Sequence, residues 1–352
     1  MSYPKLKINL DKIKQNVFTL VELCRENNIK VAGVTKVYCA DKNIVDVYLE
    51  GGVSYLADSR IQNLKKIDYT DVKKMMLRLP MISEAEEVVR YADISLNSEI
   101  DTIRELSKKA LEIGKVHQVI LMVDLGDLRE GYFKEEELMK AVEEVILLEG
   151  VDIIGLGTNM TCYGAIIPKQ ENLDKLMELK DKIESKYSLN LEIISGGNSS
   201  AIYMLGKEDL KINNLRLGES LVLGKESAYG QQIEGTVDDA FILEVEVIET
   251  KVKPSLPIGE IGKDAFGKVP EFTDRGDRTR TICAIGQQDV SVDGISLIDS
   301  DIILLGASSD HLILDTTDSK KNYRVGDIVQ FKLSYGGILS TMTSPYVDKD
   351  FI

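Results

Sequence analysis

A single lysine, Lys36, directly follows a short apolar run in the segment KVAGVTKVYCADKNIV (residues 30–45). The run from Val31 to Thr35 is typical of a buried β-strand, and helix-like sequence resumes near Asp41. A lysine amine that is desolvated at the carboxyl end of a strand is a nucleophile. The plain alternative is that Lys36 marks the point where the strand leaves the core for solvent.

The elements that must position Lys36 alternate between short β-rich runs and longer helical patterns, from residue 30 to about 225. Such alternation is typical of parallel β-α units, and eight strands in series close a TIM-type (β/α)8 barrel. We expect amphipathic helices at 98–113, 134–149 and 169–187. The expected strands are residues 30–35, 53–57, 74–79, 93–96, 117–123, 151–156, 191–195 and 214–217.

After about residue 235 the pattern changes to alternating runs separated by Gly, Pro and Asp clusters, with no long helix between them. This pattern predicts an antiparallel β domain, to which the opening segment PKLKINL (4–10) adds a strand. The sequence therefore predicts an α/β fold with the barrel over residues 10–232 and a C-terminal antiparallel β domain over 233–352, which also includes residues 1–9. The alternating runs are residues 240–252, 279–286, 301–308 and 323–335.

Composition excludes several classes of function. With 352 residues, 43% hydrophobic and 29% charged, the chain is typical of a two-domain globular protein. An excess of 58 acidic over 43 basic residues, a net charge of −15, argues against a nucleic-acid or anionic-membrane surface and is compatible with a cationic small-molecule partner. No apolar run spans a bilayer and no signal peptide is evident, so we expect a cytoplasmic protein. Scattered cysteines and two histidines predict no metal site.

Two glycine-containing loops follow the seventh and eighth expected strands, where TIM barrels commonly hold a phosphate group. The first, SGGNSSAIYM (195–204), offers serine hydroxyls at the start of a helix, and the second, LRLGESLVLG (215–224), places Gly218 to donate a backbone N–H. Tight β-α turns also need glycine, which is the structural alternative. An amine at the end of strand one, facing a phosphate site across one barrel mouth, indicates pyridoxal 5′-phosphate (PLP) bound covalently to Lys36.

With these motifs in this order, the chain resembles the alanine-racemase-like, fold-type III PLP enzymes over essentially its whole length. Lys36 stands where that family carries the PLP lysine, and a barrel followed by a β domain is the family's domain order. The segment VDLGDLREG (123–131) is similar to the family's VDTGMxRLG. This likeness implies that Arg129 contacts the phenolic oxygen of the cofactor and the substrate carboxylate, so that Lys36 and Arg129 are the expected catalytic residues.

The phosphate loops extend the resemblance. GNSSA (197–201) is similar to a family segment that carries a phosphate-binding serine, here Ser199. RLGES (216–220) is similar to the family's RPGIA, which implies that Arg216 lies opposite the pyridine nitrogen. The resemblance also implies that Gly218 and Glu219, which follow Arg216, are backbone phosphate donors. It assigns Asn159 and Tyr346 as further cofactor contacts.

The sequence departs from alanine racemases at several positions near the cofactor. Their phosphate-binding tyrosine is replaced by Ala40, their ring-stacking histidine by Asn159 and their modified lysine by Met122. Their second catalytic base, a tyrosine, aligns with Gln287 in IGQQDV, and a glutamine cannot accept a proton at neutral pH. The identity of the opposite-face base is therefore open, and the candidates in the β domain are Cys283, Asp289 and the non-aligned tyrosines.

In this family the second base reaches in from the other subunit, so the resemblance implies a homodimer with active sites shared across the interface. SSDHLILD (308–315) is similar to the family's substrate-binding segment and places Asp310 near the substrate, where its carboxylate could pair with a side-chain ammonium. A turn aspartate between two strands is the structural alternative for Asp310.

The similarity of whole segments favours one group within this superfamily. VAGVTKVYCADKNI, YLADSRIQNLKKI and GQQDV resemble the bacterial ornithine racemases. This implies an isomerase that interconverts L- and D-ornithine through Lys36 and a second base. Three alternatives stay open: an alanine or broad-specificity amino-acid racemase, a fold-type III decarboxylase, and a non-catalytic PLP-carrier protein. Arg216 argues against the decarboxylase, which carries an acid at this point, and the β domain argues against the carrier, which is a lone barrel.

Overall fold

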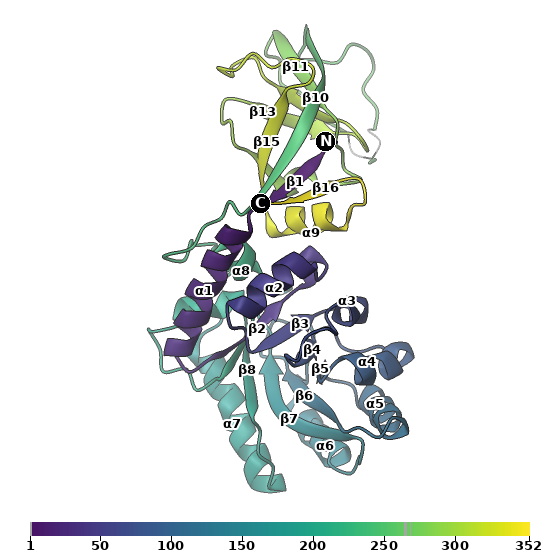
Figure 1. The fold of residues 1–352 in the computed structure, drawn as a ribbon, viewed down its shortest axis with the longest axis vertical. Coiled ribbons are helices and arrows are strands. Elements are labelled where there is room, and N and C mark those ends of the chain that lie inside the picture. Colours follow the sequence, from purple (N-terminus) through teal and green to yellow (C-terminus); the bar gives the residue numbers. More distant parts are fainter. Residues whose placement is uncertain (1, 264–265, 268) are drawn as a thin grey trace. The chain divides into compact units, whose positions relative to one another are not determined.

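A computed structural model describes residues 2–263, 266–267 and 269–352. The chain forms two compact units, one made of Asp11–Asp238 and the other of the N-terminal residues up to Leu10 together with Asp239–Ile352 (Figure 1). The first unit is a barrel and the second is built around a β-sheet. We refer to them below as the barrel unit and the β unit.

Eight parallel strands close the barrel in the order in which they follow one another along the chain, so the expected (β/α)8 architecture is confirmed. Each expected strand overlaps one observed strand, and the first pairs with the last to complete the ring. The strands are β2 (Lys30–Val34), β3 (Tyr55–Asp58), β4 (Lys74–Met76), β5 (Ile94–Asn97), β6 (His117–Val123), β7 (Val151–Thr158), β8 (Ile193–Asn198) and β9 (Asn214–Leu217).

Helices connect the barrel strands and lie outside them (Figure 1). In the helix Ile100–Glu112, Ile103, Leu106 and Ala110 recur every three to four residues and are buried, as expected for an amphipathic helix on a sheet. The α-helices are α1 (Leu10–Glu26), α2 (Lys42–Glu50), α3 (Ile61–Lys66), α4 (Ala85–Tyr91), α5 (Ile100–Glu112), α6 (Glu135–Val145), α7 (Gln170–Tyr187) and α8 (Glu219–Leu223). Short 3₁₀ helices are η1 (Lys36–Tyr38), η2 (Ile82–Glu84) and η3 (Ser199–Met204).

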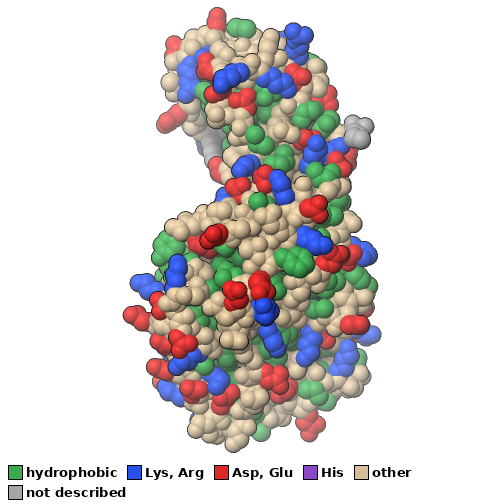
Figure 2. All heavy atoms as spheres, turned by 60° about the vertical axis from the view of Figure 1, so that its left-hand side comes forward, with side chains coloured by type: hydrophobic (Ala, Val, Ile, Leu, Met, Phe, Trp, Pro, Cys, Tyr) green, Lys and Arg blue, Asp and Glu red, His purple; other side chains and the backbone are tan. Residues whose placement is uncertain are grey.

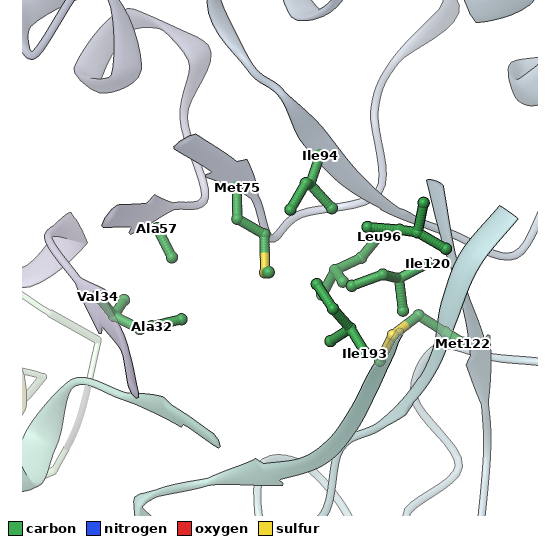
Figure 3. Packing of buried hydrophobic residues seen from close by; sticks show 10 residues of the cluster. Ala32, Val34, Ala57, Met75, Ile94, Leu96, Ile120, Met122 and Ile193 are labelled. Atoms are coloured by element: carbon green, nitrogen blue, oxygen red, sulfur yellow. The ribbon is translucent and has the colours of Figure 1, made fainter. Parts of the chain in front are cut away.

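The interior of the barrel is filled by apolar side chains that come from most of its strands and point toward one another (Figure 3). Backbones also approach closely here: a Cβ on Gly155 would lie 2.0 Å from the Ile193 carbonyl oxygen, which leaves room only for glycine. This packed interior makes the barrel a rigid support for the strand ends. The labelled residues are Ala32, Val34, Ala57, Met75, Ile94, Leu96, Ile120, Met122 and Ile193.

The β unit contains one sheet with the order β12-β15-β10-β11-β14-β13, in which all neighbours are antiparallel. The N-terminal strand β1 joins it as expected, pairing antiparallel with β10, while its other edge pairs in parallel with β16. The elements are β1 (Lys5–Ile8), β10 (Phe241–Pro254), β11 (Asp277–Cys283), η4 (Val292–Gly294), β12 (Ile295–Leu297), β13 (Ile303–Ala307), β14 (Leu312–Asp315), β15 (Ile328–Leu333), α9 (Tyr335–Thr343) and β16 (Asp348–Phe351).

Two features of the β unit differ from a purely antiparallel domain. The pairing of β1 with β16 is parallel, because the two chain termini run side by side in the same direction. The helix α9 has two glycines, Gly336 and Gly337, in its first turn, and they weaken the helical pattern in the sequence. Its first turn is stabilised by Ser334, whose hydroxyl accepts a hydrogen bond from the N–H of Gly337 at 3.2 Å.

Residues 233–238 group with the barrel unit, although the sequence analysis placed the domain boundary before them. The buried side chain of Asn16 explains this grouping. Its amide nitrogen donates to the carbonyl of Val237 at 2.9 Å, and its amide oxygen accepts from the Val237 N–H at 2.8 Å. These two hydrogen bonds attach the segment to α1, a contact between residues 221 positions apart that local pattern cannot reveal.

Acidic and basic side chains are interspersed over the face of each unit shown in Figure 2. Within the part of the chain that the structure describes, no helix is both long and apolar enough to cross a membrane. The same described residues contain no group of three or more His, Cys, Asp or Glu side chains that could hold a metal ion.

Stability is expected to fall as the pH decreases from about 6.5 to about 4, because of His117. Burial lowers the pKa of this imidazole from 6.5 to about 4, and its Nε2 lies 2.8 Å from the Ser95 hydroxyl. The unfolded chain therefore binds more protons than the folded protein in this range, so acid favours unfolding. The effect on the free energy of unfolding is about 3 kcal/mol at most. Urea denaturation at stepped pH should show a shallower dependence for His117→Gln, and equal slopes would contradict this assignment.

Candidate active site

Lys36 follows the carboxyl end of β2 after one residue, Thr35; it is partly buried and begins the 3₁₀ helix η1. The turn that follows is hydrogen-bonded back to the strand end. The N–H of Cys39 donates to the Lys36 carbonyl at 3.2 Å, and the N–H of Ala40 donates to the Thr35 carbonyl at 3.1 Å. Cys39 and Ala40 both adopt a left-handed backbone conformation, with φ of 55° and 53°. Such strained residues persist only where surrounding contacts hold them, so the backbone at Lys36 is tightly defined.

A buried carboxylate at the end of the neighbouring strand holds the residue before the lysine. Asp58 accepts hydrogen bonds from the Thr35 hydroxyl at 2.5 Å, the Arg60 N–H at 2.8 Å and the Asn63 amide at 3.2 Å. Desolvation raises the pKa of the Asp58 carboxyl, and these hydrogen bonds act in the opposite direction. The network joins the ends of β2 and β3 next to Lys36.

Arg216 lies on β9, opposite Ala32 of β2, and is 5% exposed. Its guanidinium donates to the Thr158 carbonyl at 2.6 Å and to the hydroxyl of Ser195. Burial lowers the pKa of Arg216 to about 10, so the group stays charged at neutral pH. A buried cation therefore stands on the last barrel strand, next to the strand β2 that precedes Lys36.

The two expected phosphate loops are in contact. The Ser199 hydroxyl, at the start of η3, accepts hydrogen bonds from the N–H groups of Gly218 and Ser220 at 3.4 and 3.2 Å, and lies 3.0 Å from the Ser220 hydroxyl. Asn198 caps η3 by accepting from the Ser200 N–H at 2.8 Å. Ser199 and Gly218, which the sequence predicts to bind phosphate, are thus in contact with each other and with Ser220.

The loop after β6 carries Arg129. Asp124 shapes the loop by accepting from the N–H groups of Gly126 and Leu128 at 2.8 and 3.1 Å. The loop closes at Gly131, where φ is +124° and a Cβ would lie 2.5 Å from the Asp124 nitrogen. In this tight turn Arg129 forms a bidentate ion pair with the adjacent Glu130, whose side chain is 14% exposed.

Asn159, directly after β7, links the arginine loop to the phosphate loop. Its side-chain amide lies 2.8 Å from the Asn198 amide nitrogen, and its oxygen accepts from Arg129 Nη1 at 3.2 Å when it is turned toward that guanidinium. Asn198 also donates to the Met160 carbonyl at 2.9 Å and to the Cys162 sulfur at 3.4 Å. Asn159 thus occupies a polar position among the expected cofactor-binding side chains.

Asp127, which the sequence analysis did not select, organises the segment 161–166 at the barrel mouth. Its carboxylate accepts from the N–H groups of Thr161 and Tyr163 at 3.0 Å, and from those of Cys162 and Ile166 at 3.3 Å. The side chain is 1% exposed. Asp127 is the second aspartate of the motif VDLGDLREG. The motif alone does not indicate that this aspartate binds the backbone of residues 161–166.

The predicted site residues divide between the two units. Seven of them belong to the barrel unit and lie on or after five strands that are neighbours in the ring, β6, β7, β8, β9 and β2. These residues are Lys36, Arg129, Asn159, Ser199, Arg216, Gly218 and Glu219. Glu219 begins α8, and burial raises the pKa of its carboxyl. Tyr346 and Asp310 belong to the β unit, where both are exposed.

The barrel mouth fits PLP in three respects. The hydroxyls of Thr158 and Ser200 are buried and have no hydrogen-bond partner in the part of the chain that the structure describes, so they are available to a ligand with acceptor oxygens. Gly197 is buried, yet a Cβ built on it would meet nothing within 4 Å, which indicates open space beside the phosphate loop. The donors around Ser199 and the cation of Arg216 complete a set of groups suited to a phosphate and a pyridine ring.

Comparisons with known proteins agree with this arrangement. Residues 8–226 match the family described as alanine racemase, N-terminal domain. The chain belongs to the alanine racemase family. The predicted kinship with alanine-racemase-like enzymes is therefore confirmed, and all the barrel residues assigned above lie within the matched region.

Similar proteins span the whole chain. The ornithine racemase of Acetoanaerobium sticklandii is 50% identical over 352 residues, covering 99% of this chain and 100% of that protein. The lysine racemase of Thermotoga maritima is 40% identical over 353 residues, covering 99% and 98%. Among solved structures, an alanine racemase from Bartonella henselae with covalently bound pyridoxal phosphate has a TM-score of 0.76 at 18% identity, covering 100% of both chains. That likeness supports the fold.

Replacing Asp127 with alanine is expected to lower the free energy of unfolding by about 3 kcal/mol, because four backbone N–H groups lose a charged acceptor. The segment 161–166 should also become the site of faster limited proteolysis, mapped by mass spectrometry. Asp152→Ala, which removes an exposed aspartate from β7, is the matched control and should change neither quantity. An unaltered cleavage pattern in Asp127→Ala would show that other contacts hold the segment.

Proposed function

We propose that this protein is a PLP-dependent racemase that interconverts L- and D-ornithine. The observation that carries the proposal is the arrangement at one barrel mouth of a strand-end lysine, a buried arginine and two phosphate-type loops. Full-length similarity to the Acetoanaerobium sticklandii ornithine racemase supports the substrate. Lys36, Ser199, Gly218, Glu219, Asn159 and Arg216 are proposed to hold the cofactor, with Tyr346 as a further contact.

When bound, PLP acidifies the α-proton of the amino acid linked to it. Lys36 would hold the cofactor, and its amine would move a proton at one face of Cα. Arg129 binds the substrate carboxylate. Its guanidinium group is oriented by hydrogen bonds to Glu130 and to Asn159. Removal of the proton on one face and its return on the other inverts the carbon.

Arg216 supports racemisation rather than decarboxylation. As a buried cation, it disfavours a second positive charge at the pyridine nitrogen that it would face, and so restrains the electron withdrawal that the cofactor exerts. A weaker electron sink favours return of a proton to Cα over loss of carbon dioxide. Ser195 and Thr158 hold the guanidinium in position for this role.

A second candidate substrate is lysine, which the Thermotoga maritima relative is named for. Ornithine and lysine both carry a terminal ammonium, and the net charge of −15 suits cationic substrates. Asp310, an exposed carboxylate on the turn between β13 and β14, remains the predicted substrate contact in the β unit. A panel of amino acids distinguishes these possibilities.

The active unit is proposed to be a homodimer that shares its active sites across the interface. Exposed apolar side chains from the end of β10 and the stretch that follows it support a partner surface, since isolated domains rarely expose so many large apolar side chains in one stretch of chain. Its most exposed member, Ile258, is 93% exposed. The other described members are Val252, Leu256, Ile261, Phe266, Val269 and Phe272.

L-Ornithine incubated with the PLP-loaded protein should be converted to a mixture of both enantiomers, measured by chiral chromatography. L-lysine, L-alanine and L-norvaline should react more slowly. Borohydride treatment should fix the cofactor on Lys36, and Lys36→Ala should lose this adduct and about 10³-fold or more in rate. Lys42→Ala, which removes a nearby exposed lysine, is the control. A protein that takes up no cofactor, or that releases carbon dioxide from L-ornithine, would contradict the proposal.

Dilution is expected to lower the activity per chain in parallel with dissociation of the dimer, because each site would need residues from both subunits. Sedimentation velocity at the same concentrations gives the fraction of dimer. Constant activity per chain in a preparation shown to be monomeric would rule out shared active sites.

A further inference from the structure

The segment YLADSRIQNLKKI (residues 55–67), which resembles the ornithine racemases, forms β3 and α3 of the barrel unit. It supplies none of the predicted contacts to cofactor or substrate. β3 pairs in parallel with β2, so both strands end at the same barrel mouth (Figure 1). The segment therefore lies beside the short turn Lys36–Cys39, called the lysine turn below, and its contacts with that turn indicate what it contributes.

The residue before the lysine turn is held by this segment. Thr35 is fully buried, and its hydroxyl donates to the carboxylate of Asp58 at 2.5 Å. Thr35 stands at the N-terminal cap of η1, where a threonine hydroxyl ordinarily binds a backbone N–H, but here its side chain makes no capping hydrogen bond. Asn63, in the first turn of α3, donates to both oxygens of Asp58 at 3.2 Å and so orients the carboxylate.

The end of the lysine turn is held by the same segment. Nζ of Lys66, in the last turn of α3, donates to the Cys39 carbonyl at 2.8 Å. Cys39 has a left-handed backbone with φ of 55°, and its N–H donates to the Lys36 carbonyl at 3.2 Å. A residue other than glycine keeps this conformation only where contacts hold it. The bond from Lys66 is one such contact, at the carbonyl of the strained residue itself.

The middle of the lysine turn packs on α2. Tyr38, the last residue of η1, is fully buried, and its ring meets that of Tyr48 edge to face, with the ring centroids 5.3 Å apart. Tyr48 lies in turn against Gly33 of β2, where a Cβ would be 2.7 Å from the tyrosine ring. Apolar contacts thus fix the middle of the turn, and polar contacts from the segment 55–67 fix its two ends.

We propose that Asp58 and Lys66 are positioning residues for Lys36. Asp58 acts through Thr35 at the start of the lysine turn, and Lys66 acts through the carbonyl at its end. The inference rests on the proposed function, in which Lys36 holds the cofactor and moves a proton at one face of Cα. A lysine side chain is long and flexible, so the reach of its amine is defined only where its backbone is fixed. A displacement of about 1 Å at a reacting group can lower a rate about 10²-fold.

The first test uses the PLP-free protein. Amide hydrogen exchange in peptides that span the lysine turn, followed by mass spectrometry, reports how often the turn opens. Thr35→Val, which keeps the shape of the side chain and removes its hydroxyl, should speed this exchange about tenfold, because a hydrogen bond to a buried carboxylate is lost. Lys66→Met, which removes an exposed donor, should speed it about threefold. Lys175→Met, which replaces an exposed lysine of α7, is the matched control and should leave it unaltered.

The second test uses the PLP-loaded protein and separates positioning from stability. Thr35→Val should lower kcat for L-ornithine about tenfold and change KM by less than about twofold, because the substrate contacts are intact. Thr35→Ser restores the hydroxyl and should recover most of kcat. Lys66→Met should lose less, and Lys175→Met should lose nothing. The rate at which Lys36 captures PLP, measured as adduct fixed by borohydride at timed intervals, should fall in the same order.

Two outcomes in an active parent enzyme would overturn the inference. One is parental hydrogen exchange across the lysine turn in both Thr35→Val and Lys66→Met. The other is faster exchange combined with parental kcat and parental cofactor capture, which would make these contacts structural only. Should Thr35→Val fail to fold, Lys66→Met decides between the same outcomes, since its side chain is exposed. A parent protein that takes up no PLP would instead contradict the proposed function, and with it any positioning role toward Lys36.

Discussion

Pairing of the first barrel strand with the last, β2 with β9, is the contact on which the active site depends. The parallel register sets Ala32 opposite Arg216, although the two residues are separated by most of the barrel sequence. Parallel strands in a closed ring place all their carboxyl ends at one mouth. A lysine at the end of the first strand therefore meets an arginine and two phosphate-type loops at the end of the last two. Without ring closure these groups would lie at opposite edges of an open sheet.

Buried carboxylates give the mouth its detailed shape. Asp58 joins two strand ends, Asp124 folds the loop that carries Arg129, and Asp127 holds the segment 161–166 through four backbone N–H groups. Each accepts several hydrogen bonds, which offsets the free-energy cost of burying its charge. Loops without regular structure are thereby as well defined as the strands. This is the condition for holding catalytic side chains at fixed positions.

The chain keeps the family's architecture while it changes individual chemical groups. Met122, at the position of a modified lysine in alanine racemases, is an apolar member of the barrel core and cannot support an arginine. The negative charge beside Arg129 comes instead from the adjacent Glu130, because the tight turn at Gly131 brings neighbouring side chains together. In the β unit, Gln287 is hydrogen-bonded to the turn that carries an aspartate–histidine pair.

The sequence by itself determined the order of strands and helices, the barrel-type alternation and the strand-end position of Lys36. These follow from local periodicity and from motifs such as RLGES, whose residues are neighbours along the chain. Only the tertiary structure decided which groups pair: Thr35 with Asp58, Asp127 with the 161–166 segment, and the 233–238 segment with α1. Such pairs are separated by 23 to 221 positions. Their formation depends on ring closure and on burial, which no short stretch of sequence specifies.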